Sequence, residues 1–281
     1  MRVATRWFGT AVGIGALCLA SAVVASPATA VPGLVRVVSA GTADSVNKTQ
    51  NAACPAGTIA IGGGGRINNG LGQVVMNTVL PLVGGGAFSV TAREDDTGYA
   101  GAWSLTATAL CAPAGSVQVV THNGTIGSTK LRWATATCPA GKRVLGVGGD
   151  ISGGLGQVAL ADFQPMADLS GVRIEGVEDG DGYAGTWSVR AQAICATPPA
   201  GLVRVHATSV SSSSATKTVV ASCPAGTRVH GVGGRIANGS GQVVLDDMLA
   251  SSASNVTATG MEDGNGYAGT WSVTAFAVCA P

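Results

Sequence analysis

The strongest pattern of apolar and polar positions along the chain is an alternation with a period of two residues. Between positions 187 and 195, Trp, Val, Ala, Ala and Cys occupy every second place, and Ser, Arg, Gln and Ile stand between them. The same alternation runs through 103–111 and 271–279. Side chains at every second position of a strand share one face. Each segment is therefore predicted to be a β-strand with one buried face.

Shorter alternations occur at 156–163 and 171–177, and glycine interrupts the other candidate segments. No stretch of the sequence shows the periodicity of an amphipathic helix. We therefore expect an all-β fold of three tandem antiparallel β repeats. They are expected to form either a β-prism-like body or β-sandwich units packed in a pseudo-threefold arrangement.

The repeat is a unit of about 84 residues that occurs three times. The motif CPAG stands at 54–57, 138–141 and 223–226, and the closing cysteines at 111, 195 and 279 are 84 residues apart. We expect repeats at 31–114, 115–199 and 200–281. About five residues separate a closing cysteine from the next predicted strand, which is the length of a turn. The repeats must therefore be neighbours in space, as one closed prism or as adjacent units.

The first thirty residues have the pattern of a secretory signal peptide. Arg2 and Arg6 precede an uncharged apolar run, and small residues at 28–30 follow it. A membrane anchor is the alternative, but the run is short for a membrane span of about 20 residues. We expect cleavage after Ala30 and a secreted, extracellular product with no membrane association afterwards.

The charge of the remaining chain is close to zero. The sequence has 16 Lys and Arg against 15 Asp and Glu, and loss of Arg2 and Arg6 leaves 14 against 15. A nucleic-acid-binding protein would show a basic stripe, and no such cluster is present in the sequence. We therefore expect no nucleic-acid partner.

Six of the seven cysteines lie in the repeats, two in each. Six cysteines allow 15 pairings. A copied unit that folds by itself should carry its own bridge, so the repeat favours Cys54–Cys111, Cys138–Cys195 and Cys223–Cys279. Metal ligation is the alternative, but no cysteine has a second one two to four residues away. We expect no metal site.

Glycine is concentrated in the segment that follows each CPAG motif, at 62–65, 146–149 and 231–234. A run of glycine in a strand indicates a bend or the close approach of another group. The large rigid side chain of each repeat is its tryptophan. We therefore expect Trp103, Trp187 and Trp271 each to cover the glycine strip of its own repeat.

Little in the sequence indicates catalysis, and we expect a protein that is not an enzyme and has no cofactor. The common hydrolase and phosphate-binding motifs are missing. Glu-Asp pairs could act as acid and base, but adjacent strand residues point to opposite faces. The segment from Asp179 partly matches a calcium loop, yet Arg190 stands where the closing acid belongs. Asp-Gly and Asn-Gly instead predict a hairpin turn.

These turns are the candidate binding sites. A loop with two carboxylates and a tyrosine has hydrogen-bond acceptors and an aromatic face, which suit sugar recognition. Tyrosine as an anchor of the fold is the alternative, and a repeated glutamine at 73, 157 and 242 is equally ambiguous. The candidate residues are Glu94, Asp95, Tyr99, Glu178, Asp179, Tyr183, Glu262, Asp263 and Tyr267.

The series CPAG, GVGG, GYAGTWSV and Cys resembles a type of uncharacterised secreted actinobacterial protein built of cysteine-framed β repeats. The resemblance covers 33–281 and implies no defined activity. A looser resemblance of architecture links the three copies to β-prism proteins, which include lectins.

The sequence therefore predicts a secreted binding protein that recognises an extracellular glycan or cell-wall polymer through repeated turns. Three equivalent sites would add avidity on a polymer. The first alternative is a structural or protein-interaction protein of the cell surface, and the second is a secreted hydrolase.

Overall fold

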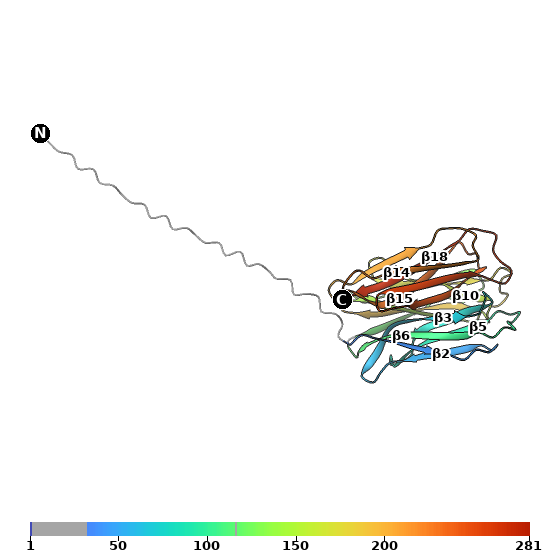
Figure 1. Ribbon diagram of the computed structural model, residues 1–281, viewed down its shortest axis with the longest axis horizontal. Coiled ribbons are helices and arrows are strands. Elements are labelled where there is room, and N and C mark those ends of the chain that lie inside the picture. Colours follow the sequence, from blue (N-terminus) through green and yellow to red (C-terminus); the bar gives the residue numbers. More distant parts are fainter. Residues whose placement is uncertain (2–32, 116) are drawn as a thin grey trace.

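The computed structural model describes Met1 and residues 33–115 and 117–281, so most of the expected signal peptide lies outside the described residues. The described chain forms eighteen β-strands and no helix, which confirms the all-β prediction (Figure 1). The strands are β1 (Val35–Ala40), β2 (Lys48–Ala53), β3 (Thr58–Asn68), β4 (Val74–Pro81), β5 (Ala87–Glu94), β6 (Ser104–Pro113), β7 (Gln118–Asn123), β8 (Leu131–Thr137), β9 (Arg143–Ser152), β10 (Val158–Pro165), β11 (Gly171–Glu178), β12 (Ser188–Ala196), β13 (Val203–Thr208), β14 (Thr216–Ser222), β15 (Arg228–Ala237), β16 (Val243–Ala250), β17 (Asn255–Glu262) and β18 (Ser272–Ala280).

Each repeat contributes six strands arranged as two antiparallel layers of three. In the first repeat the layers are β1-β6-β3 and β2-β5-β4, and the other repeats follow the same order. The strand that ends in the closing cysteine lies in one layer, and CPAG follows a strand of the other. A disulfide in each repeat therefore joins its two layers. The predicted pairs Cys54–Cys111, Cys138–Cys195 and Cys223–Cys279 are confirmed.

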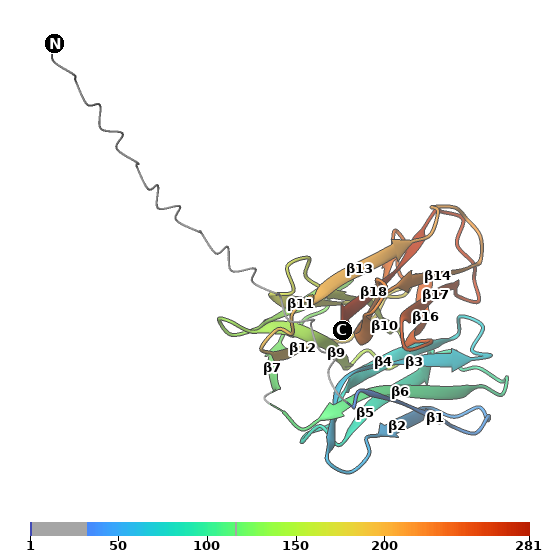
Figure 2. The ribbon, with the colours of Figure 1, turned by 60° about the vertical axis from the view of Figure 1, so that its left-hand side comes forward.

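The three sheets are shared between repeats, so the repeats close into a ring. Each sheet has six strands, three from one repeat and three from another. The junctions are the antiparallel pairs β3–β16, β4–β9 and β10–β15. In Figure 2 the strands of the first repeat, in blue and cyan, lie beside the red strands of the third. The prediction of a closed pseudo-threefold body is the one that the structure shows.

The glycine strips lie where the three repeats meet. A β-carbon on Gly146 would stand 2.1 Å from the Ile61 carbonyl oxygen and 3.0 Å from the Gly62 α-carbon. Gly62 faces the backbone of Gly231 in the same way, and Gly231 faces Gly146. Three backbones therefore contact one another directly around the axis, which requires the absence of side chains at these positions.

The expectation that each tryptophan covers the glycine strip of its own repeat is wrong, because other residues lie over the strips. The atoms nearest to the strip glycines come from the neighbouring repeat or from the facing layer, for example Phe88 at Gly63. The rings of Trp187 and Trp271 instead lie against Gly176 and Gly260, near the ends of β11 and β17. All three rings are buried, at 0–1% exposure.

The residue before the first strip glycine forms a β-bulge in each repeat. These residues are Ile61, Leu145 and His230, and all three are buried. His230 is completely buried, with Nδ1 3.0 Å from the Arg228 carbonyl oxygen. Its Nε2 has no hydrogen-bond partner among the described residues. Burial lowers the pKa of His230, and the bond to Arg228 opposes that effect in part.

We expect substitutions at the contact of Gly62, Gly146 and Gly231 to destabilise the fold strongly. Gly146→Ala should lower the free energy of unfolding by about 1–3 kcal/mol or more, because its methyl group overlaps the backbone of the first repeat. Gly86→Ala is the control, because a β-carbon there meets no atom within 4 Å. Urea unfolding measures both. Equal stability of the two variants would contradict the close approach.

His230→Leu should stabilise the protein, since the equivalent positions hold Ile61 and Leu145. The pKa of His230 is lower in the native state than in the unfolded chain. The free energy of unfolding therefore decreases as the pH falls below about 6.5. The variant should gain about 1 kcal/mol at pH 7. Its advantage should grow between about pH 6.5 and 5. Unfolding midpoints measured across that range check this, and a constant difference would rule out the titration.

Candidate functional site

The three acidic turns lie at one end of the axis, opposite the disulfides. Each turn connects the two layers of its repeat, for example β5 to β6, and these strands do not pair, so the predicted hairpin is wrong. The backbone N–H of the first aspartate in each turn donates to the carbonyl oxygen of the repeated glutamine. The distances are 3.0 Å for Asp95 to Gln73, 3.0 Å for Asp179 to Gln157 and 2.9 Å for Asp263 to Gln242. The turn and the glutamine loop of each repeat therefore form one unit.

Neighbouring repeats are joined at this end by the glycine that precedes each glutamine. Gly156 has a φ of 98°, and a β-carbon there would stand 2.2 Å from the Glu94 carbonyl oxygen of the first repeat. Gly241 contacts the turn of the second repeat in the same way, and Gly72 contacts the turn of the third. Only glycine combines this conformation with such a close approach. The three turns are thereby drawn together around the axis.

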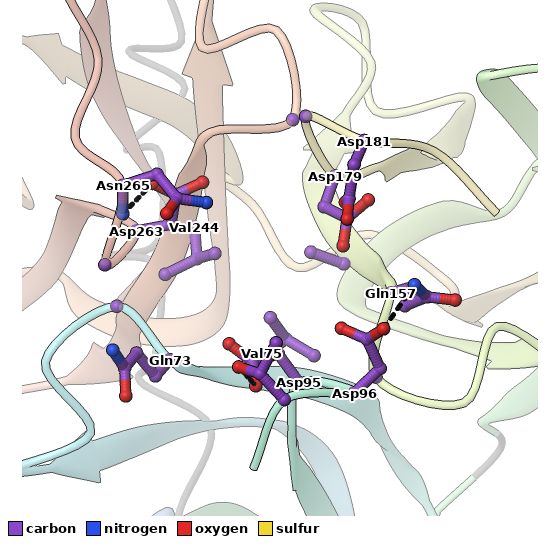
Figure 3. A pocket seen from close by; sticks show the side chains of 17 residues that line it. Gln73, Val75, Asp95, Asp96, Gln157, Asp179, Asp181, Val244, Asp263 and Asn265 are labelled. Atoms are coloured by element: carbon purple, nitrogen blue, oxygen red, sulfur yellow. Dashed lines mark hydrogen bonds between the residues drawn. The ribbon is translucent and has the colours of Figure 1, made fainter. Parts of the chain in front are cut away.

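An open cavity of about 150 Å³ lies between the turns (Figure 3). Its floor is a small apolar cluster of Val75, Ala159 and Val244, one residue from each repeat. We call this cavity the axial mouth. Its polar wall consists of Gln73, Asp95, Asp96, Gln157, Asp179, Asp181, Asp263 and Asn265.

The carboxylates of the axial mouth influence one another. Partial burial, a hydrogen bond to Asp181 and the charges of Asp181 and Asp96 raise the pKa of Asp179 to about 7. Burial raises the pKa of Asp263 as well, with contributions from the charges of Glu262 and Asp95. Ionised acids held this close favour a bound proton or a cationic group.

The wall of the axial mouth is not symmetric. The candidate residues predicted from the sequence did not include Asp96, Asp181 and Asn265. Asp96 and Asp181 stand at non-equivalent places in their turns, and Asn265 takes the place of Asp181 in the third repeat. Gln157 Nε2 donates to Asp96 Oδ2 at 2.8 Å and so joins the second repeat to the first. The repeated glutamines were visible in the sequence, but the meeting of the three turns was not.

The predicted glutamates have a different position. Glu178 is buried, its Oε1 accepts from Trp187 Nε1 at 2.7 Å, and its Oε2 accepts from the Tyr183 backbone N–H at 3.3 Å. Equivalent bonds are present in the other repeats for Glu94 and Glu262. These carboxylates connect the turn to the core and do not line the axial mouth.

A cation covers the tryptophan ring in each repeat. The distances to a ring centroid are 4.2 Å for Lys48 and Trp103, 5.8 Å for Arg132 and Trp187, and 3.4 Å for Lys217 and Trp271. Such contacts stabilise an aromatic ring by about 0.5–2 kcal/mol. The cation, the indole and the glutamate together fix the base of each acidic turn.

The predicted tyrosines lie outside the axial mouth. Tyr99, Tyr183 and Tyr267 are half-buried and pack against the core. Each ring covers the glycine two residues further on, where a β-carbon would approach the ring within about 2.4–2.5 Å. The Tyr267 hydroxyl also pairs with Ser240 Oγ at 3.2 Å. The turn thus separates its tyrosine from its aspartates.

Comparison with protein-family models and with curated proteins gave no match. Within the described ranges, no group of three or more His, Cys, Asp or Glu side chains is placed to hold a metal ion. The same part of the chain has no helix long and apolar enough to cross a membrane.

The two acids of one turn should respond in opposite ways to substitution. Glu178→Gln places an amide where two donors converge and should destabilise the fold by about 1–3 kcal/mol. Asp179→Asn should stabilise it above pH 7, because the raised pKa of Asp179 makes its charged form unfavourable in the native state. Urea unfolding at pH 8 with tryptophan fluorescence measures both. Equal destabilisation would show that both acids support the fold.

Proposed function

We propose that this is an exported, non-enzymatic binding protein whose axial mouth takes an amine-bearing glycan, such as a glucosamine-containing envelope polymer. The observation that supports this proposal is the convergence of five carboxylates and three amides from three repeats on one cavity. Ionised carboxylates bind an ammonium group through short, charge-assisted hydrogen bonds. The amides of Gln73 and Gln157 suit hydroxyl groups, and the apolar floor suits a C–H face.

The arrangement favours one composite site in place of three separate ones. Each turn supplies only part of the wall, and no repeat by itself would enclose the ligand. Avidity from three equivalent turns is therefore not the mechanism we propose. A single ligand at the axis would contact Asp96, Asp179 and Asp263 from three different repeats.

Export is supported by the disulfides. Three intramolecular disulfides indicate an oxidising compartment, and such bridges are typical of secreted and cell-surface proteins. The expected signal peptide at 1–30 agrees with this compartment. An extracellular polymer is then the class of ligand that the protein would meet.

A protein-interaction role is the second candidate, and the outermost strands favour it. Strands β1, β7 and β14 lie at sheet edges and carry the exposed side chains of Val38, Val119 and Val220. Exposed edges of this kind can pair with another chain. Under this alternative, changes in the axial mouth would not affect partner binding.

Titration with glucosamine oligomers tests the proposal. We expect one site per chain, weakening as salt rises, and a loss of about tenfold in affinity or more for Asp179→Asn combined with Asp181→Asn. The control is Asp168→Asn in the loop after β10, at the disulfide end of the molecule. Three sites per chain, or equal affinity of both variants, would overturn the axial assignment.

A further inference from the structure

A second cluster of polar side chains lies on the outer face of the sheet shared by the second and third repeats. This sheet has the order β13-β18-β15-β10-β11-β8. One residue of each strand stands in register, so that a row crosses the whole sheet. The row is Thr208, Thr274, Arg235, Asp162, Glu175 and Trp133. At about 4.8 Å per strand, it presents successive side chains at a regular spacing.

Two members of the row depart from the pattern of the repeat. The places of Trp133 and Glu175 are taken by Thr49 and Thr91 in the first repeat, and by Thr218 and Thr259 in the third. The third-repeat pair forms a simple hydroxyl contact of 3.0 Å. Since the fold is complete with threonines at two of the three places, it does not require a tryptophan at the third.

Trp133 is exposed and held in place. Its side chain has 54% exposure, whereas the other three tryptophans that the structure describes are buried. The Arg173 guanidinium lies 4.9 Å from the ring centroid and pairs with Glu175 at 2.6 Å. An indole fixed by a cation, with much of its surface open, provides a flat apolar platform of the kind that the C–H face of a sugar can cover.

Polar atoms without partners lie beside this platform. The Asp162 side chain has 5% exposure, and its Oδ2 is 3.6 Å from Arg235 Nε. Its Oδ1 is buried with no hydrogen-bond partner among the described residues, and the same holds for Arg173 Nε. Buried polar atoms in native proteins are nearly always paired, with protein, water or a ligand. Both atoms are closed to solvent, so the hydroxyl groups of a ligand would reach them through a small movement of the Asp162 and Arg173 side chains.

The surface beside the row is hollowed. A shallow hollow of about 270 Å³ is lined by Leu131, Ala161, Glu175, Val177 and Ile236, together with the loop at 238–241. Leu131 and Val177 are the neighbours of Trp133 and Glu175 on the same face of their strands. Gly241 also lines the axial mouth, so the two cavities adjoin.

Both signs of charge are present on this face. Arg173, Arg204 and Arg235 stand against Glu175 and Asp162, in contrast to the wall of carboxylates and amides at the axial mouth. A row of donors and acceptors beside an aromatic platform suits a neutral polyhydroxylated chain. It offers little to a strongly charged polymer.

We propose that this outer face, with Trp133 as its platform and Asp162, Glu175 and Arg173 as its polar contacts, binds a neutral linear oligosaccharide. The site adjoins the axial mouth at Gly241 but is lined by other side chains, and it does not depend on the ligand proposed there. Its ligand would lie across β8, β11 and β10, and the hollow would take the adjoining sugar units.

Fluorescence of Trp133 tests this site without altering it. In a Trp7→Phe protein, the remaining tryptophans are Trp133 and the three buried ones, so acrylamide should quench Trp133 preferentially. The probes are cello-, xylo- and N-acetylchito-oligosaccharides. We expect at least one series to protect Trp133 from quenching in a saturable way. Failure of all three to protect it would overturn the proposal.

Affinity electrophoresis with the protecting sugar then assigns the residues. We expect Trp133→Ala to weaken binding by about tenfold or more and Asp162→Asn to weaken it by a smaller factor. Thr218→Ala, at the equivalent place on another face, should bind as the parent protein does. The axial variant Asp179→Asn with Asp181→Asn should also bind normally, which separates this site from the axial mouth. Unchanged binding by Trp133→Ala would overturn the assignment.

Discussion

The direct contact of three strand backbones at the axis is the constraint on which the rest of the structure depends. Gly62, Gly146 and Gly231 bring β3, β9 and β15 closer together than any side chain would allow. Glycine in a strand is unfavourable in isolation, because it adds chain entropy and no packing surface. Here the close approach offsets that loss. It also sets the spacing of the loops that begin further along the same strands.

The mouth is a consequence of that spacing. The positions of the central strands place the glutamine loops and the acidic turns around the axis, at the end opposite the disulfides. Each turn then divides its residues by depth. Glu178 points to the core and binds the Trp187 indole, whereas Asp179 remains at the axis beside carboxylates from other repeats. Structural and chemical roles thus belong to adjacent residues.

Differences between the three copies carry as much information as their similarity. Requirements of folding act on all copies alike, so the cation over each tryptophan and the glutamate beneath it are repeated. Asp181 and Asn265, in contrast, differ between turns that fold in the same way. Trp133 and Glu175 likewise occupy places where threonine suffices elsewhere. Such positions are free to serve a ligand, because the fold does not fix them.

The sequence by itself determined the local features of the molecule. Alternation with a period of two gave the strands, and the copy number of cysteines gave the disulfides, since both depend on residues within one repeat. The sequence also identified Asp179 and Gln157 as repeated polar residues. The prediction that tryptophan covers the glycine strips was wrong. The sequence could not assign Asp96 and Asp181 to one cavity, or place Trp133 beside Asp162.

Only the tertiary structure decided how the repeats meet. Each sheet is completed by strands from another repeat, and the residues across such a junction are far apart along the chain. Nothing in the period of one repeat states whether its turns will point outward separately or converge. Convergence follows from the backbone contact at the axis, because three glycine strands that touch leave their loops around a single opening. The three copies of the acidic turn therefore line a single cavity, the axial mouth.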